Sequence, residues 1–298
     1  LAIPRHYMID AKYRTAVKQQ GICGDCYAQS AVTVLETAIA IALNESATEL
    51  SVYQGAACTY QCAGGSTTDV WKYLVRTGYV VAANSDCSTQ SCTCIDATRN
   101  VTTGLGFELN SPDFYMPPAI NLRSPEELAW HLLSGGSSIS IEVAAYFESF
   151  KFYKSGIYKC PMNIAGSQLD HIATIEGFRS YPVGYWIVRN SWGKKWGVDG
   201  YIFMDMVTCR NVATNDGGHP AAIRLKTTRR LSMCDFQSTN ACERLELCES
   251  AEDRSCCHTL NTPTYSCDVR CASHGRPGAD NKYCDYNSCI CGPVATHT

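Results

Sequence analysis

The sequence predicts an α+β fold in which a helical part comes before an antiparallel sheet. Near the N-terminus, apolar residues recur at helical spacing over one long segment. After residue 136, a segment alternates between apolar and polar residues, and short β-rich runs separated by glycines follow it. Helices and strands that occupy separate parts of a chain are typical of α+β proteins. We therefore expect two lobes with a natural cleft between them.

The helical part begins at Cys26, because residues 26–43 contain neither Pro nor Gly. Asp25 precedes this segment and is a good N-cap residue, which places Cys26 at or within the first turn. Further helices are predicted around residues 69–78 and at residues 124–134, where a Ser, a Pro and two acids mark the start. The apolar positions with helical spacing in the first segment are Ala28, Ala31, Val32, Leu35, Ile39 and Ala42.

The sheet part begins with "SSISIEVAA", where Ile139, Ile141 and Val143 share one face and Ser140 and Glu142 the other. This alternation predicts a β-strand. Three more β-rich runs follow, namely "HIATIEGF", "YWIVRN" and "GYIFMDM".

Length, composition and charge narrow the class of protein. A chain of 298 residues, 45% of them hydrophobic, can form one large domain or two unequal ones. A net charge of −3 does not suggest a nucleic-acid partner. No uninterrupted apolar run of about 18 residues is found, so no membrane span is expected. The opening "LAIPRHYMID" looks like a processed start rather than an export signal.

The 19 cysteines indicate an oxidising compartment, so we expect a secreted or a lysosomal or vacuolar protein. Sequons at Asn44 and Asn100 are candidate N-glycosylation sites and fit that setting. Because the cysteine count is odd, full pairing would leave one free thiol.

The cysteines divide the chain, since nine lie in residues 1–226 and ten in the last 72 residues. We expect a main domain at residues 1–226, a linker at 227–233 and a small disulfide-stabilised domain at 234–298.

Three interpretations fit Cys23 and Cys26 in "QQGICGDCYAQS": half of a zinc site, a redox pair, or a disulfide cysteine beside a nucleophile. Cys58 and Cys62 could complete a zinc site, but the oxidising context favours disulfides, and we expect neither metal nor cofactor. A redox pair usually follows a strand in a βαβ unit, whereas helices follow here.

The third interpretation needs an activating base. A thiol at a helix N-terminus loses its proton more easily, and an imidazole completes the activation. Only His171 among the seven histidines begins a β-rich run, and Asn190 ends another. An Asn can accept a hydrogen bond from the imidazole and hold its orientation.

Three motifs in order, "QGICGDCYA", "LDHIATIEGF" and "VRNSWGKKWGVDGYIFM", resemble the papain-like cysteine peptidases of the cathepsin group, over residues 3 to about 226. His171 lies 145 residues after Cys26 and Asn190 lies 164 after it, while Asp25 replaces the usual small residue. The resemblance implies a two-lobed fold and a peptidase acting on proteins or peptides, with proteinaceous cysteine-protease inhibitors as further candidate partners. No long insertion of the kind that blocks the cleft in carboxydipeptidase members is seen, which favours an endopeptidase.

By the same resemblance, Cys26 is the nucleophile and His171 the general base and acid. Asn190 orients His171, Trp192 shields that contact from water, and Gln20 stabilises the oxyanion together with the backbone N–H of Cys26.

The resemblance also implies a set of substrate-binding residues. Two glycines would let the substrate backbone approach the cleft wall, unless they only form a turn. In the second specificity pocket, the Glu142 carboxylate would attract Lys or Arg, unless it is a solvated strand residue. The set is Gly64, Gly65, Ser66, Thr67, Glu142, Asp170, Trp192 and Thr214.

For the disulfides of the main domain, the resemblance implies that Cys23 pairs with Cys62 and Cys160 with Cys209. Cys58 would pair with one of three cysteines, Cys87, Cys92 and Cys94, and the choice stays open.

Residues 256–292 resemble the cysteine-stabilised αβ fold of invertebrate defensins, through a C-x3-C pair followed by C-x4-C-x-C. The resemblance implies the bridges Cys267–Cys289 and Cys271–Cys291, and a bridge from Cys284 to Cys256 or Cys257. Basic and acidic residues balance from Cys257 onward, so we expect a recognition, docking or stabilising module of unknown partner rather than a membrane-attacking one. The rival hypothesis for the whole chain is a non-enzymatic binding or defence protein on a protease scaffold.

Overall fold

A computed structural model of the chain describes ten segments and divides the chain into two units. The first unit holds residues 1–98 and 109–228 and the second residues 99–108 and 229–298. In the second unit, β3 (Gly106–Glu108) pairs antiparallel with β11 (Arg230–Leu231), and β12 (Lys282–Asp285) with β13 (Ile290–Pro293). The described residues are 4–83, 106–109, 114–121, 124–161, 169–180, 182–213, 219–225, 230–231, 282–285 and 290–293.

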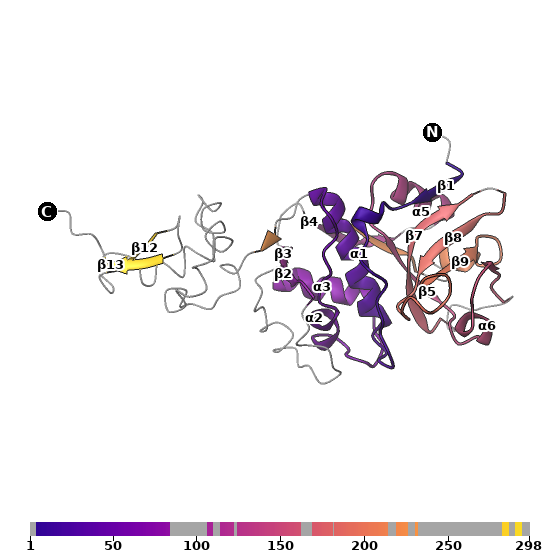
Figure 1. Cartoon of the computed structure of the whole chain (residues 1–298), viewed down its shortest axis with the longest axis horizontal. Coiled ribbons are helices and arrows are strands. Elements are labelled where there is room, and N and C mark those ends of the chain that lie inside the picture. The colour runs from indigo at the N-terminus through magenta and orange to yellow at the C-terminus, as the bar shows by residue number, and fades with distance from the viewer. Residues whose placement is uncertain are drawn as a thin grey trace. The chain divides into compact units, whose positions relative to one another are not determined.

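The helical part of the first unit is built around α1, Cys26–Leu43, which has the predicted bounds. The helices α2 (Val52–Ala57) and α3 (Thr67–Thr77) lie beside it (Figure 1), and Trp71 Nε1 of α3 donates to the Ala31 carbonyl at 2.9 Å. By length and composition α1 could cross a membrane, although no membrane span is predicted from the sequence. However, 78% of it is buried inside the fold, so it is the core helix of this lobe.

The sheet part is an eight-stranded sheet in the order β4-β10-β5-β7-β8-β9-β6, with β1 added beside β7. All its pairs are antiparallel except β6 with β9. The helices α5 (Pro125–Leu133) and α6 (Glu148–Lys151) accompany the sheet, while β2 (Tyr79–Val81) follows α3. The strands are β1 His6–Met8, β4 Phe114–Asn121, β5 Ile139–Val143, β6 Ile157–Tyr158, β7 His171–Arg179, β8 Tyr185–Arg189, β9 Tyr201–Asp205 and β10 Ala221–Leu225.

The strand β5 shows how the two lobes meet. Ile139, Ile141 and Val143 are buried in the core of the sheet lobe, as their alternation predicts. Ser140, on the other face, is also buried, because it contacts the helical lobe. Its hydroxyl lies 2.9 Å from Ser30 Oγ of α1 and 3.0 Å from Thr67 Oγ1 of α3. Hydroxyl pairs therefore join the two lobes at Ser140.

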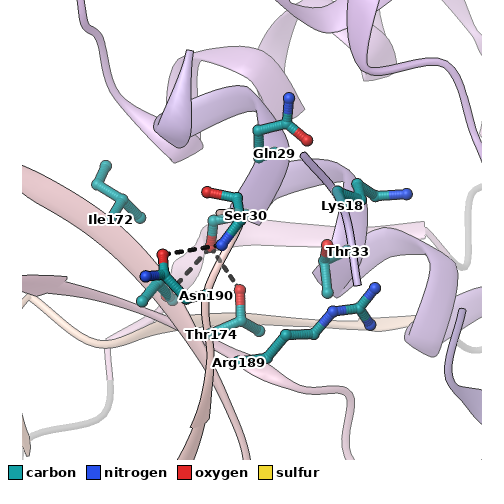
Figure 2. A pocket seen from close by; sticks show the side chains of 10 residues that line it. Lys18, Gln29, Ser30, Thr33, Ile172, Thr174, Arg189 and Asn190 are labelled. Atoms are coloured by element: carbon teal, nitrogen blue, oxygen red, sulfur yellow. Dashed lines mark hydrogen bonds between the residues drawn. The ribbon is translucent and has the colours of Figure 1, made fainter. Parts of the chain in front are cut away.

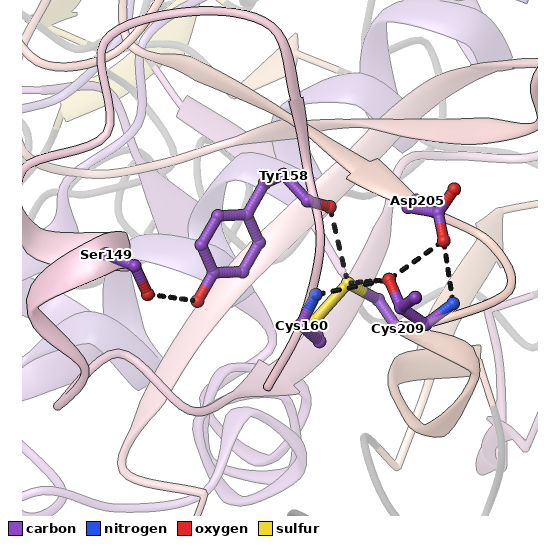
Figure 3. Close-up of a disulfide and its surroundings, with 6 residues drawn as sticks. Ser149, Tyr158, Cys160, Asp205 and Cys209 are labelled. Carbon is purple, nitrogen blue, oxygen red and sulfur yellow. Dashed lines mark hydrogen bonds between the residues drawn. A yellow bond between two sulfur atoms is a disulfide. The ribbon is translucent and has the colours of Figure 1, made fainter. Parts of the chain in front are cut away.

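Two disulfides hold segments that carry no regular structure. Cys23 is joined to Cys62 and Cys160 to Cys209, which are the pairings that the resemblance implies. Figure 3 shows the second bridge beside Asp205, whose carboxylate accepts from the Thr208 hydroxyl at 2.8 Å. Cys58 is disulfide-bonded as well, and its candidate partners lie outside the described residues.

A buried network of charges connects the N-terminal segment to both lobes. The Glu176 carboxylate of β7 is fully buried and accepts from Arg189 at 2.9 Å and from the Tyr201 hydroxyl at 2.7 Å. Arg189 also donates to the hydroxyl of Thr15 and to the carbonyl of Ala16. A second pair, Lys18 and Glu36, lies 2.6 Å apart and ties the same segment to α1.

Replacing Glu176 by Gln should destabilise the fold by about 3 kcal/mol or more, because Arg189 would keep its charge in the interior without a counter-ion. Urea unfolding followed by tryptophan fluorescence measures this. Glu126→Gln, at an exposed position of α5, removes the same charge, and its free energy of unfolding should stay within about 0.5 kcal/mol of the parent. Equal midpoints for the two variants would show that the ion pair adds nothing.

Candidate active site

Cys26 is the first residue of α1, and it is the one free cysteine among the described residues. Asp25 is the N-cap residue as predicted, but its side chain does not cap the helix. The reason is its backbone, which has φ −97° and ψ 19° instead of the extended conformation that a capping side chain needs. The Asp25 carboxylate instead accepts from Gln29 Nε2 at 3.0 Å.

His171 is the first residue of β7 and is 6% exposed. One ring nitrogen, Nε2, lies 2.8 Å from Asn190 Oδ1. The backbone N–H of Ser191 also donates to this oxygen at 2.8 Å, which fixes the orientation of the Asn190 amide. Oδ1 must therefore accept from the ring, so His171 carries its proton on Nε2 when neutral. This leaves Nδ1 to exchange a proton with a thiol.

Aromatic rings cover the contact between His171 and Asn190. The ring centroids of Trp192 and His171 lie 5.0 Å apart, and Phe150 of α6 lies 6.3 Å from the imidazole. Burial lowers the pKa of His171, while the hydrogen bond that His171 donates to Asn190 and the charge of Asp170 raise it. The site thus excludes water but keeps two groups that favour the imidazolium.

The thiol of Cys26 experiences opposing influences. Burial raises its pKa, hydrogen bonds from the backbone of Ile172 and Tyr27 lower it, and the charges of Asp25 and Asp170 raise it. The N-terminus of α1 adds a favourable potential for a thiolate. Because burial opposes each charge separately, the charged forms are best stabilised as a thiolate–imidazolium pair.

Gln20 lies on the segment before Cys26 and is held at both ends of its amide. Its Nε2 donates to the Cys23 carbonyl at 2.9 Å, and its Oε1 accepts from the Ser191 hydroxyl at 2.5 Å. Since an amide NH₂ has two hydrogens, one remains for a ligand. Gln20 is thus preorganised as a hydrogen-bond donor near Cys26.

The residues predicted to bind substrate backbone occupy different environments. Gly64 has φ +80° and open space where a side chain would be, so it combines a glycine-requiring turn with room for a ligand. At Gly65 a side chain would clash with Tyr60, so packing explains this glycine. Ser66 occupies the N-cap position of α3, but its hydroxyl pairs with Thr68 Oγ1 at 2.8 Å and makes no capping bond. Thr67 is 5% exposed, and its hydroxyl is bonded to Ser140. Thr67 therefore joins the lobes and is not open to solvent.

The remaining predicted residues lie on or near β5 and β7. Glu142 is partly exposed, and its carboxylate is 3.1 Å from Nδ1 of His219. Asp170 accepts from the backbone N–H of Ala145 at 2.7 Å, which fixes the carboxylate before His171. Thr214 lies outside the described residues, as does the sequon residue Asn100, while Asn44 is exposed at the C-terminus of α1.

A small pocket with polar lining residues lies between α1 and the strands β7 and β8. Figure 2 shows Gln29, Ser30 and Thr33 on the helix side and Thr174 and Asn190 on the strand side. Within the described part of the chain, no three His, Cys, Asp or Glu side chains are grouped in a way that could hold a metal ion.

Sequence reasoning missed four contributors to this site. Ser191 orients both Gln20 and Asn190, and its place directly after Asn190 could have suggested this. Phe150 and His219 reach the site only through the fold, so no local signal marks them. The contact of Gln29 with Asp25 follows i, i+4 helical spacing and could have been expected.

The fold and the site together define a class: a two-lobed α+β scaffold that holds a thiol at a helix N-terminus beside an imidazole oriented by an amide. Within that class, the chain belongs to the papain family of cysteine proteases, whose family model matches residues 5–216.

Individual relatives are similar over the same region. Identity is 31% over 199 residues to digestive cysteine proteinase 3 of Homarus americanus and 32% over 203 residues to procathepsin L of Rattus norvegicus. These matches cover 64% and 63% of this chain but only 57% and 56% of the relatives. The bromelain protease of Ananas comosus in complex with the E64 inhibitor shares the fold, with a TM-score of 0.60, 24% identity, and coverage of 74% of this chain and 99% of that one.

Asn190→Ala should slow alkylation of Cys26 by iodoacetamide at pH 6 by about tenfold, because it removes a hydrogen bond that favours the charged imidazole. Asn190→Asp is the matched variant, since it keeps the acceptor and adds a charge that raises the pKa of His171. Its rate should hold to higher pH than that of the parent. Identical pH profiles for the parent and both variants would contradict the orienting role of Asn190.

Proposed function

We propose that this chain is a cysteine endopeptidase that hydrolyses peptide bonds through Cys26 and His171. The observation that carries the proposal is the fixed tautomer of His171, since Asn190 takes its Nε2–H and leaves Nδ1 for the free thiol at the start of α1. Membership of the papain family supports the same reaction.

In the proposed reaction, Cys26 first transfers its proton to Nδ1 of His171. The thiolate sulfur attacks the scissile carbonyl carbon, and the electron pair of the C=O bond moves to the oxygen. Gln20 Nε2 and the backbone N–H of Cys26 then donate to that oxyanion. As the intermediate collapses, the C–N bond breaks and His171 protonates the leaving amine. Water, deprotonated by His171, then cleaves the thioester and regenerates the thiol.

The rival function, a binding or defence protein on a protease scaffold, is not favoured. Such a protein would have no need to keep Gln20, Cys26, His171 and Asn190 together. Holding the amides of Gln20 and Asn190 in fixed orientations also costs conformational entropy, and this arrangement benefits catalysis rather than binding alone.

Gln20→Ala should lower kcat about 100- to 1,000-fold and change KM little, because its amide is expected to bind the oxyanion only in the transition state. Turnover of a fluorogenic peptide measures both constants. Cys26→Ala should abolish turnover, and it should also abolish labelling of the folded protein by a thiol-reactive epoxide peptide. Hydrolysis that survives in Cys26→Ala would end the proposal.

Substrate preference is proposed to depend on Glu142. The carboxylate is open to solvent on β5, where it could contact a basic side chain of the substrate one residue before the cleaved pair. His219 also contacts it, so the His219 side chain would compete with a basic substrate side chain for the carboxylate.

A peptide library with Arg or Leu at that substrate position tests this pair. Glu142→Gln should reduce kcat/KM for the Arg substrates about tenfold relative to Leu, in line with one lost charge contact. His219→Ala should strengthen the preference for Arg, because it removes the competing contact with Glu142. An equal preference for Leu in the parent and both variants would show that Glu142 is only a solvated strand residue.

The C-terminal region is proposed to be a cysteine-stabilised αβ module with a recognition or stabilising role. The support is its cysteine spacing together with the hairpin of β12 and β13, in which Cys284 and Cys291 stand directly opposite each other. The predicted partners of these two cysteines, Cys256 or Cys257 for Cys284 and Cys271 for Cys291, lie outside the described residues, as does the predicted pair Cys267 and Cys289. Given the disulfides, we propose an oxidising location, either secreted or lysosomal.

A further inference from the structure

Asp25 is a buried carboxylate next to the nucleophile, and the proposed mechanism does not use it. The residue is 3% exposed. Of its two oxygens, Oδ2 accepts from Gln29, while Oδ1 is buried with no hydrogen-bond partner in the structure. A carboxylate in such surroundings is costly to keep charged. Its presence at this position therefore calls for a role.

The groups around Asp25 do not neutralise it. On α1 the neighbours are Cys26, Tyr27 and Gln29, and Tyr53 faces it from α2. Burial raises the pKa of both tyrosines, and the charge of Asp25 raises it further. These tyrosines are therefore neutral at acidic and neutral pH. Burial also raises the pKa of Asp25 to about 6, against lowering hydrogen bonds from Gln29 and its own backbone.

Asp170 differs from Asp25 in what it acts on. The charge of Asp170 raises the pKa of both Cys26 and His171, so it favours the imidazolium while it disfavours the thiolate. Among the influences on these two groups, Asp25 acts on Cys26 alone. An ionised Asp25 thus works against the reactive thiolate without helping the imidazolium.

Gln29 is suited to both forms of Asp25. Its Nε2 donates to the ionised carboxylate, and its Oε1 has no hydrogen-bond partner in the structure. After rotation of the amide, that oxygen could accept from the protonated acid. A partner that satisfies either form lets the proton come and go without breaking the fold.

We propose that Asp25 is a proton-operated control on the nucleophile, so that Cys26 is restrained when Asp25 is ionised and released when Asp25 takes up a proton. The proposal rests on the proposed function only in naming Cys26 as the nucleophile. Protonation of Asp25 removes a negative charge beside the thiolate, and by linkage the thiolate holds that proton more tightly on Asp25. The enzyme would thus be favoured in an acidic compartment and held back near neutral pH.

The test compares Asp25→Asn with the parent across pH 4.5 to 8, using the iodoacetamide alkylation rate of Cys26 in the full chain. At pH 7.5 the variant should react about tenfold faster, equal to one unit of thiol pKa. At pH 4.5 the two should agree within about twofold, because Asp25 is then already neutral. Glu126→Gln, which removes an exposed charge on α5, should leave the profile unchanged. Superimposable profiles for Asp25→Asn and the parent would overturn the proposal.

Two further measurements keep the test decisive if Asp25→Asn does not fold. Gln29→Leu removes a hydrogen bond that lowers the pKa of Asp25, so it should move the inflection of the alkylation profile to higher pH. In the parent labelled with 13C at the Asp carboxyl carbons, one signal should titrate near pH 6 and shift when Cys26 is blocked by a neutral methyl disulfide. If every Asp signal titrates below about pH 4.5, close to an unperturbed carboxyl, the control does not exist. Neither readout requires peptide hydrolysis, so failure of the peptidase proposal would remain distinguishable.

Discussion

The pairing of residues 18–20 with residues 191–193 is the constraint on which the rest of the site depends. Gln20 N–H donates to the Ser191 carbonyl at 2.8 Å, and Gly193 N–H donates to Lys18 at 2.9 Å. These bonds connect the segment before Cys26 with the segment after Asn190. Gly193 has φ +75° and no room for a side chain beside Gln19, so glycine is required there. The nucleophile and the orienting amide are thus set by one short ladder, although 164 residues separate them.

The buried ion pairs support this ladder at both of its ends. Lys18 is anchored to Glu36 in the middle of α1, and Arg189, directly before Asn190, is anchored to Glu176 on β7. The charged groups are nearly or fully desolvated, so each charge is tolerated only when its partner is in place. A slip of the ladder by one residue would break a buried pair, and this converts a small displacement at the site into a large free-energy cost. The ion pairs thus fix the register of the ladder. This is a specific role for an interaction whose desolvation costs free energy.

Sequence reasoning succeeded where the signal is local and failed where it comes from distant contacts. The bounds of α1 and the start of β7 at His171 follow from periodicity and are confirmed. The pairing of β1 with β7 was not predicted, since three residues at the chain start carry too little pattern. The capping role of the Asp25 side chain was wrong because the backbone of Asp25, with φ −97° and ψ 19°, is not in the extended conformation that capping needs. His219 could not have been found either, because only the fold brings it to Glu142.

Asp25 stands where the family pattern usually has a small residue, and the rest of the site suggests a reason for it. Several polar groups near Cys26 have hydrogen-bond partners: Gln20 at both ends, Asn190 through Oδ1, and Asp170 through the Ala145 N–H. Among the described residues of this region, the buried atoms without a partner are Asp25 Oδ1, Gln29 Oε1 and Asn190 Nδ2, and the first two belong to the pair that is proposed to change state. A Ser at this position would carry no charge, so it would add no pH-dependent charge beside the thiol. With a carboxyl there, the proposed nucleophile gains a second response to pH, because acid removes the charge of Asp25 that disfavours the thiolate.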